Sequence, residues 1–233
     1  MAADEIRLFG PVAIRPLLER LAAGFTAETG WPVASRFELN PKIAELILEG
    51  APFDLALSNP AHIEAVIGAG RAAASTHRAF GRVPLALARR GPPDAAPAES
   101  PEAIRALLSG AGSVAYTGEG TSGKTFLDAL ARLGLSETMA SRVRPMGAGE
   151  PVAALAEGAV DLAAAPLSTV LAKAAIAPAA ILPPGIAAPI EMSMVLSPDA
   201  AARDGPRRLL DRLADRALDA VLAEHGLRRF ALG

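Results

Sequence analysis

The chain has 233 residues, and its 23 Lys and Arg against 25 Asp and Glu give a formal net charge of −2. A nearly neutral chain has no basic field to attract nucleic acid or an anionic membrane, so we expect neither as a partner. Hydrophobic residues make up 51% and charged residues 21%, a mixture typical of a globular protein. Cysteine is absent, which excludes disulfides, thiolate catalysis and Cys-ligated metals.

The sequence predicts no membrane span and no export signal. The most apolar region, residues 159–190, is interrupted by Asp161, Lys173 and several prolines, so it does not form the apolar helix of about 20 residues that spans a bilayer. The chain starts at Met1 without the basic and apolar segments of an export signal. We expect a soluble protein that is periplasmic if Met1 replaces a removed signal peptide and cytoplasmic otherwise.

The first part of the chain alternates short strands and helices. We predict strands over 6–9, 32–37 and 54–57, and helices over 14–29, over 41–48 and after Asn59-Pro60. Gly30 and Gly50 are expected to end the first two helices. This alternation predicts a parallel sheet with helices on both faces, and ligand groups at the carboxyl ends of its strands.

A second alternating region lies inside the chain. An extended segment at 83–89 leads into the Pro-rich residues 91–97. We then predict strands over 113–116, 143–146 and 160–164, helices over 124–133 and 152–157, an extended return at 190–196 and one amphipathic helix over 207–225. The expected fold is two α/β lobes, residues 1–81 with 190–233 and inserted residues 82–189, joined by extended hinge segments with a ligand cleft between them.

Four phrases of the chain carry a resemblance to a known family. Residues 48–58 read LEGAPFDLALS, similar to the family phrase EEGAPADVFISA, and residues 156–161 are similar to its VxxGEAD turn. Residues 25–30 and 129–135 are similar to two of its helix ends. These phrases resemble the type II periplasmic solute-binding fold, in its molybdate-binding-like branch. The resemblance implies a monomer that binds a small anion between its lobes, without a metal or cofactor, and that delivers the anion to the permease of an ABC transporter.

The predicted binding loops depart from the molybdate pattern. The first loop reads GPVA at 10–13, where the pattern offers a Ser, and the second reads LNPK at 39–42, where it offers two. Residues 165–168 read APLS, where the family often carries a Tyr. The loop at 117–126 resembles a subgroup that includes an aconitate isomerase. The ligand therefore stays open between a molybdate-like oxyanion and a small carboxylate, and the alternative function is an isomerase acting on a small tricarboxylate.

Residues 118–125, GEGTSGKT, also satisfy the P-loop pattern GxxxxGK[ST] between a predicted strand and a predicted helix. A nucleotide hydrolase needs a carboxylate at a strand end for Mg²⁺, whereas Asp54 and Asp161 lie at strand starts. We therefore favour a small-anion site built from backbone N–H groups and a positive helix end. A Gly-rich turn that serves only the strand-to-helix geometry is the other interpretation.

The candidate ligand-binding residues lie in the predicted strand-to-helix loops. Lys42 and Lys124 at two helix starts suit a carboxylate or phosphate, or else point to solvent as we expect of Arg15. Thr121 and Ser122 either donate to an anion or cap their helix. The full set is Gly10, Pro11, Val12, Asn40, Lys42, Ser58, Thr121, Ser122, Gly123, Lys124, Glu150 and Ser168.

An isomerase would need a base near the substrate carbon, and the candidates are Glu150, Glu119 and His62. Glu150 has a second interpretation, since a carboxylate at a helix start is stabilised by the helix dipole. The histidines His62, His77 and His225 show no metal-ligand spacing, so we expect no metal site.

Overall fold

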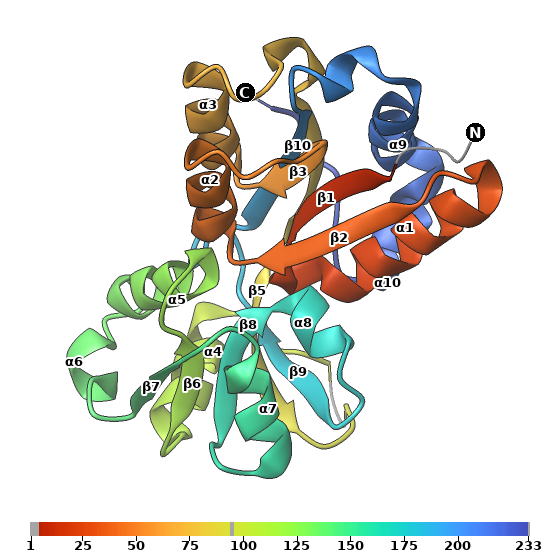
Figure 1. Cartoon of the computed structure of the whole chain (residues 1–233). Helices are drawn as coiled ribbons and strands as arrows, with labels where there is room; N and C mark the ends of the chain where they lie inside the picture. The colour runs from red at the N-terminus through yellow and green to blue at the C-terminus, as the bar shows by residue number, and fades with distance from the viewer. Residues whose placement is uncertain (1–4, 94–95, 233) are drawn as a thin grey trace. The chain divides into compact units, whose positions relative to one another are not determined.

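The computed structural model describes residues 5–93 and 96–232 (Figure 1). Met1, on which the expectation about export depends, lies outside the described residues, as do residues 94 and 95 of the Pro-rich segment. The chain divides into two compact units. Unit 1 comprises the residues up to Arg82 together with those from Glu191 onward, and unit 2 comprises Val83–Ile190.

Unit 1 contains sheet A, whose strand order is β2-β1-β3-β10-β4. Strands β1, β2 and β3 are parallel, and β10 runs antiparallel to β3. The strands are β1 (Ile6–Pro11), β2 (Val33–Glu38), β3 (Leu55–Ser58), β4 (Arg78–Val83) and β10 (Ile190–Leu196). The helices are α1 (Arg15–Thr29), α2 (Asn40–Leu48), α3 (Pro60–Gly68), α9 (Asp204–Ala214) and α10 (Asp219–Glu224), with short 3₁₀ turns η1 (Val12–Ile14), η2 (Ala74–Thr76), η3 (Ala200–Ala202) and η4 (Arg216–Leu218).

Unit 2 contains sheet B, whose strand order is β7-β6-β8-β5-β9. Strands β6, β7 and β8 are parallel, and β5 runs antiparallel to both of its neighbours. The strands are β5 (Leu85–Arg90), β6 (Val114–Thr117), β7 (Val143–Met146), β8 (Leu162–Pro166) and β9 (Ile176–Ile181). The helices are α4 (Pro101–Gly110), α5 (Thr121–Arg132), α6 (Ser136–Met139), α7 (Glu150–Glu157) and α8 (Leu167–Leu171).

Helices cover both faces of each sheet, which explains the continuous apolar runs of β3 and β8 (Figure 1). In unit 1, α2 and α3 pack against each other and close one core with Phe9, Phe53 and Val195. In unit 2, apolar residues of α4, α5 and α6 meet alternate residues of β5, β6 and β8. Within the described part of the chain, no helix combines the length and the hydropathy that a membrane span requires.

The prediction of two α/β lobes is confirmed, and β7 and β10 have the predicted bounds. The alternating strands β1–β3 and β6–β8 are parallel as predicted, and the extended segments at 83–89 and 190–196, which were expected as hinges, supply the antiparallel strands β5 and β10. The prediction of a single helix over 207–225 is wrong. The carboxylate of Asp215 accepts a hydrogen bond from the backbone N–H of Ala217 and starts a new turn, which separates α9 from α10.

Several other element predictions require correction. Helix α5 begins at Thr121, three residues before the predicted start, and α7 begins at Glu150 instead of residue 152. Strand β8 begins at Leu162 instead of residue 160. The predictions omitted α4, α6, α8, β4 and β9. The earlier start of α5 matters for function, because it places Thr121, Ser122 and Gly123 in the first turn of the helix.

Candidate functional site

The three parallel strands of sheet A each lead into a helix at their carboxyl ends. Strand β1 runs into η1 and α1, β2 into α2, and β3 into α3, so these helices begin at one edge of the sheet (Figure 1). The described residue that immediately precedes each of these helices makes no side-chain hydrogen bond to the first turn. The backbone N–H groups of an uncapped first turn and the positive end of the helix dipole favour an anion.

Sheet B repeats this arrangement with β6 and α5, β7 and α7, and β8 and α8. The residues before α5 and α7 are Gly120 and Gly149, whose φ angles of 113° and 80° are rarely adopted by residues with a side chain. In the described part of unit 2, the residue before each of these three helices likewise makes no side-chain cap. Each unit therefore presents a carboxyl edge, by which we mean the edge of its sheet where the parallel strands end and their helices begin.

Gly123 fixes the start of α5 against β6. This glycine is buried, and a Cβ atom built on it would collide with the carbonyl oxygen of Thr117, the last residue of β6. The hydroxyl of Thr125 donates to the carbonyl oxygen of Thr121 within the same helix. The Gly-rich loop therefore has a geometric role, whatever it binds, because only glycine allows the helix to approach the strand end this closely.

The basic residues at the helix starts are paired with carboxylates of their own helices. Lys124 is 79% exposed, and its Nζ lies 2.9 Å from a carboxylate oxygen of Asp128. Lys42 pairs with Glu45 at 3.1 Å, and a hydrogen bond and the charge of Glu45 raise the pKa of Lys42. Arg15 pairs in the same way, with Glu19. The structure thus favours the solvent-facing interpretation for all three cations.

We predict that Lys124→Met leaves anion affinity within about twofold of the wild-type value, because the ammonium already pairs with Asp128 in solvent. The loss of that exposed pair should change the free energy of unfolding by no more than about 0.5 kcal/mol. Calorimetric titration and urea unfolding measure the two quantities. A loss of affinity of tenfold or more would show that Lys124 contacts the ligand directly.

A buried polar cluster lies at the carboxyl edge of sheet A. The Ser58 side chain is fully buried at the end of β3, and its Oγ donates a 2.8 Å hydrogen bond to the carbonyl oxygen of Asn40. The same Oγ lies 3.5 Å from Oδ1 of Asn40 and 3.4 Å from Nδ1 of His62. Asn40 is 7% exposed at the start of α2, and His62 is half-buried in the first turn of α3. The structure therefore joins three sequence-predicted candidates through one hydroxyl.

Three side chains that were not among the predicted site residues, Ser193, His77 and Asn59, extend this cluster to β10. Ser193 is fully buried and pairs directly with Ser58 across the two antiparallel strands. Its Oγ lies 2.8 Å from Nε2 of His77, and Asn59 donates a 2.6 Å hydrogen bond to the carbonyl oxygen of Glu191. One signal was available in the sequence, since Ser193 interrupts the otherwise apolar run Met192–Leu196.

The remaining candidates occupy separate positions. The Glu150 carboxylate accepts a 2.7 Å hydrogen bond from the backbone N–H of Gly147, so it closes the loop before its own helix. Glu119 is exposed in the loop before α5, and Ser168 is 4% exposed in α8. The residues expected in the first loop divide between two elements, with Gly10 and Pro11 ending β1 and Val12 starting η1. Across the described residues, no three His, Asp or Glu side chains gather as metal ligands would.

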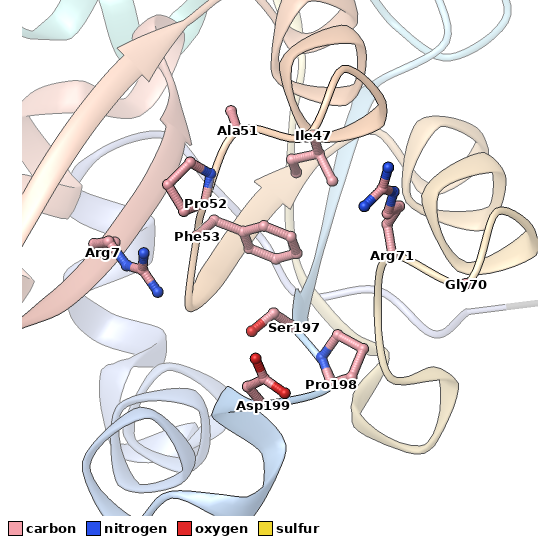
Figure 2. A pocket seen from close by; sticks show the side chains of 11 residues that line it. Arg7, Ile47, Ala51, Pro52, Phe53, Gly70, Arg71, Ser197, Pro198 and Asp199 are labelled. Carbon is pink, nitrogen blue, oxygen red and sulfur yellow. The ribbon is translucent and has the colours of Figure 1, made fainter.

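A cavity of about 260 Å³ lies at the opposite edge of sheet A, beyond the last turns of α2 and α3 (Figure 2). Figure 2 shows the Phe53 ring inside it, with Arg7, Arg71 and Asp199 around it. The Arg7 side chain is already hydrogen-bonded to the buried carboxylate of Asp54. The carbonyl groups that end α2 and α3 carry partial negative charge, which disfavours an anion. None of the candidate residues from the sequence lines this cavity.

The comparisons with known proteins agree with this architecture. A model of the family described as bacterial extracellular solute-binding protein matches residues 6–228. The periplasmic molybdate-binding protein of Azotobacter vinelandii is similar with a TM-score of 0.81 and 19% identity, over 95% of this chain and 98% of that chain.

Two further solved structures are similar over nearly the whole of this chain. The sulfate-binding protein of Mycobacterium tuberculosis gives a TM-score of 0.74 at 15% identity, over 97% of this chain and 86% of that chain. The tungstate-binding protein of Desulfovibrio alaskensis gives 0.68 at 14% identity, over 99% and 100%. At these identities the likeness shows a shared fold. No curated protein matches the sequence.

Proposed function

This chain belongs to the family of bacterial extracellular solute-binding proteins, and we propose that it captures a small oxyanion and delivers it to the permease of an ABC transporter outside the cytoplasm. The observation that supports this most is that each unit has a carboxyl edge where helices begin, and that the described residue before each of these helices makes no side-chain cap. In the proposed complex, backbone N–H groups at these helix starts donate to the anion.

The electrostatics of the helix starts favour a compact oxyanion over a tricarboxylate. Lys42, Lys124 and Arg15 are each paired with a carboxylate, so little full positive charge is left to balance three carboxylates. Backbone N–H groups, helix dipoles and small polar side chains instead stabilise a small ion whose charge is spread over several oxygens. The similar proteins named for molybdate, sulfate and tungstate agree with this ligand class.

The alternative function is an isomerase that acts on an aconitate-like tricarboxylate. The observation in its favour is the long Gly-rich segment at 117–126, whose residues from Thr121 onward form the start of α5. Of the three candidate bases, Glu150 already accepts a hydrogen bond from the Gly147 N–H, which leaves Glu119 and His62 as the stronger ones. The same binding experiment separates the two functions.

We expect molybdate, tungstate or sulfate to raise the thermal unfolding midpoint, because a ligand that binds only the folded state stabilises it by mass action. At 100 times the dissociation constant, the gain is about 2.7 kcal/mol. Differential scanning fluorimetry with these ions, phosphate, citrate and both aconitate isomers measures it. Ser122→Leu, which fills the first turn of α5, should abolish the shift. A response to citrate or aconitate alone would instead support the isomerase, to be followed by an ultraviolet assay of isomer interconversion.

A further inference from the structure

Ser58 determines the protonation state of one ring nitrogen of His62. A hydroxyl has a single proton to donate, and Ser58 gives it to the carbonyl oxygen of Asn40 at 2.8 Å. Toward Nδ1 of His62, at 3.4 Å, the Ser58 oxygen can therefore only accept. The favoured neutral form of His62 consequently carries its proton on Nδ1, and Nε2, on the other side of the ring, points away from Ser58 with a free lone pair.

Ser58 Oγ also contacts the side chain of Asn40 at the carboxyl edge of sheet A. Oδ1 of Asn40 lies 3.5 Å from Ser58 Oγ, so the amide of Asn40 and the ring of His62 are anchored to one atom. Asn40 is 7% exposed, and its amide nitrogen, for which no described group is an acceptor, keeps contact with solvent, since it is not one of the buried unpartnered atoms of the described chain. A solvent-accessible amide N–H on a side chain held by Ser58 is free to donate to a ligand oxygen at this edge.

His62 also differs electrostatically from its neighbours at this edge. Lys42 and Arg15 are neutralised by carboxylates on their own helices, whereas no described carboxylate forms an ion pair with His62. The charged group that faces it is Glu45 from α2, and Ser58 faces it from β3. Burial lowers the pKa of His62, while the charge of Glu45 raises it, and the lowering is larger. The free protein therefore holds His62 neutral at pH 7.

We propose that Ser58 positions a two-residue clamp, in which the Asn40 amide and His62 Nε2 both contact the bound anion and His62 takes up a proton when the anion binds. This inference rests on the proposed function and adds pH regulation of the same site. Neutral Nε2 has a lone pair that repels an anion's oxygen, so the contact requires protonation. Binding then adds one positive charge beside the anion without a permanent cation in the empty site.

The coupling between anion binding and protonation of His62 determines how the affinity for the anion depends on pH. A bound anion stabilises the imidazolium form and raises the pKa of His62 above its value in the free protein. Affinity is therefore constant above the pKa of the complex, and it increases as pH falls until the pKa of the free protein is passed. A pKa difference of about one unit between the two states corresponds to about a tenfold change in affinity.

Calorimetric titration with sulfate and molybdate at pH 5.5 and pH 8, in pairs of buffers with different ionisation enthalpies, tests the clamp. The sulfate dianion keeps its charge over this range. We expect wild-type affinity to be about tenfold higher at the lower pH, with proton uptake on binding. His62→Gln should remove both effects, whereas the control His225→Gln, at the end of α10, should retain them. Asn40→Ala should weaken binding about tenfold at both pH values.

A second measurement does not depend on any variant. The imidazole resonances of His62 in NMR titrations should show a pKa that rises by about one unit when sulfate is added, while those of His225 do not move. Binding with no proton uptake, or a pH dependence that persists in His62→Gln, would overturn the clamp and leave the proposed function intact. No binding of any oxyanion at either pH would instead overturn the proposed function, and the clamp with it.

Discussion

Asp54→Asn should lower the free energy of unfolding of unit 1 by about 3 kcal/mol at pH 7, the lower end of the range for breaking a buried ion pair. Asp54 is 1% exposed just before β3. Its carboxylate accepts hydrogen bonds from the Arg7 backbone N–H at 2.8 Å, from Arg7 Nε at 3.1 Å and NH2 at 3.0 Å, and from Arg203 NH1 at 2.7 Å. One carboxylate thus links β1, β3 and the segment before α9.

The lower end of that range applies because the two arginines are not fully buried. The side chains of Arg7 and Arg203 are 45% and 34% exposed, so water solvates both guanidinium groups once Asp54 is neutral. What is lost is the negative charge of the acceptor, so the hydrogen bonds from the two guanidinium groups are weakened and partly replaced by hydrogen bonds to water. Asparagine keeps one acceptor oxygen for the Arg7 backbone N–H, which limits the damage to the fold.

Asp54→Asn should also make the free energy of unfolding less dependent on pH in the acid range. Burial alone raises the pKa of Asp54, but the hydrogen bonds and charges of Arg7, together with the charge of Arg203, outweigh burial and hold the pKa below its ordinary value. The stabilisation from Asp54 is therefore complete above about pH 4, its ordinary pKa, and is lost as pH falls through the lower pKa of the folded state. Asp54→Asn removes this contribution at every pH.

Urea unfolding between pH 3 and pH 7 measures both effects. The matched control is Glu19→Gln, which removes the exposed pair with Arg15 in the same unit and should change the free energy of unfolding by less than about 1 kcal/mol. If Asp54→Asn were as mild as Glu19→Gln at pH 7, the buried ion pair would contribute nothing beyond an exposed one.

This ion network also shows what local sequence patterns cannot supply. Strand and helix periods identify elements such as β7 and β10, because a period is a property of neighbouring residues. Asp54 lies 47 residues from Arg7 and 149 from Arg203, and no local spacing connects them. From the sequence, Asp54 is simply a carboxylate at a strand start.

The candidate site shows the same division between local and distant information. The loop before α5 was predictable because the Gly-rich turn and the helix it starts are adjacent in the chain. The pairing of Lys124 with Asp128 was also available, since a spacing of four residues on a helix brings side chains together. The contact between His77 and Ser193, which are 116 residues apart, was not, because it depends on β10 entering sheet A antiparallel to β3.

Among the described glycines of unit 2, Gly123 is the position where replacement by alanine should destabilise the unit most. The new Cβ would overlap the carbonyl oxygen of Thr117, which belongs to the backbone at the end of β6, and the Cβ itself is fixed to the backbone of the first turn of α5. Neither a rotamer change nor a flexible side chain relieves this overlap, so α5 must move away from β6. We expect a loss of about 3 kcal/mol in the free energy of unfolding, the upper end of the range for overpacking.

The displacement should also remove anion binding, because the first turn of α5 supplies N–H groups to the proposed site. We expect at least a tenfold loss of affinity for the best oxyanion, measured by calorimetry under conditions where Gly123→Ala remains folded by circular dichroism. Hydrogen bonds to a charged group contribute about 1.5–3 kcal/mol each, so misplacing a single N–H is sufficient for this loss.

Gly110→Ala provides the matched control. Gly110 is the last residue of α4 in the same unit, its φ is not positive, and a Cβ built on it meets no atom within 4 Å. Alanine there should leave stability unchanged or raise it by up to about 1 kcal/mol, because it restricts the unfolded chain without strain in the folded one. Equal stability of Gly123→Ala and Gly110→Ala would contradict this prediction. It would mean that α5 can move away from β6 without lowering the free energy of unfolding, so that the close packing of Gly123 does not fix the first turn of α5.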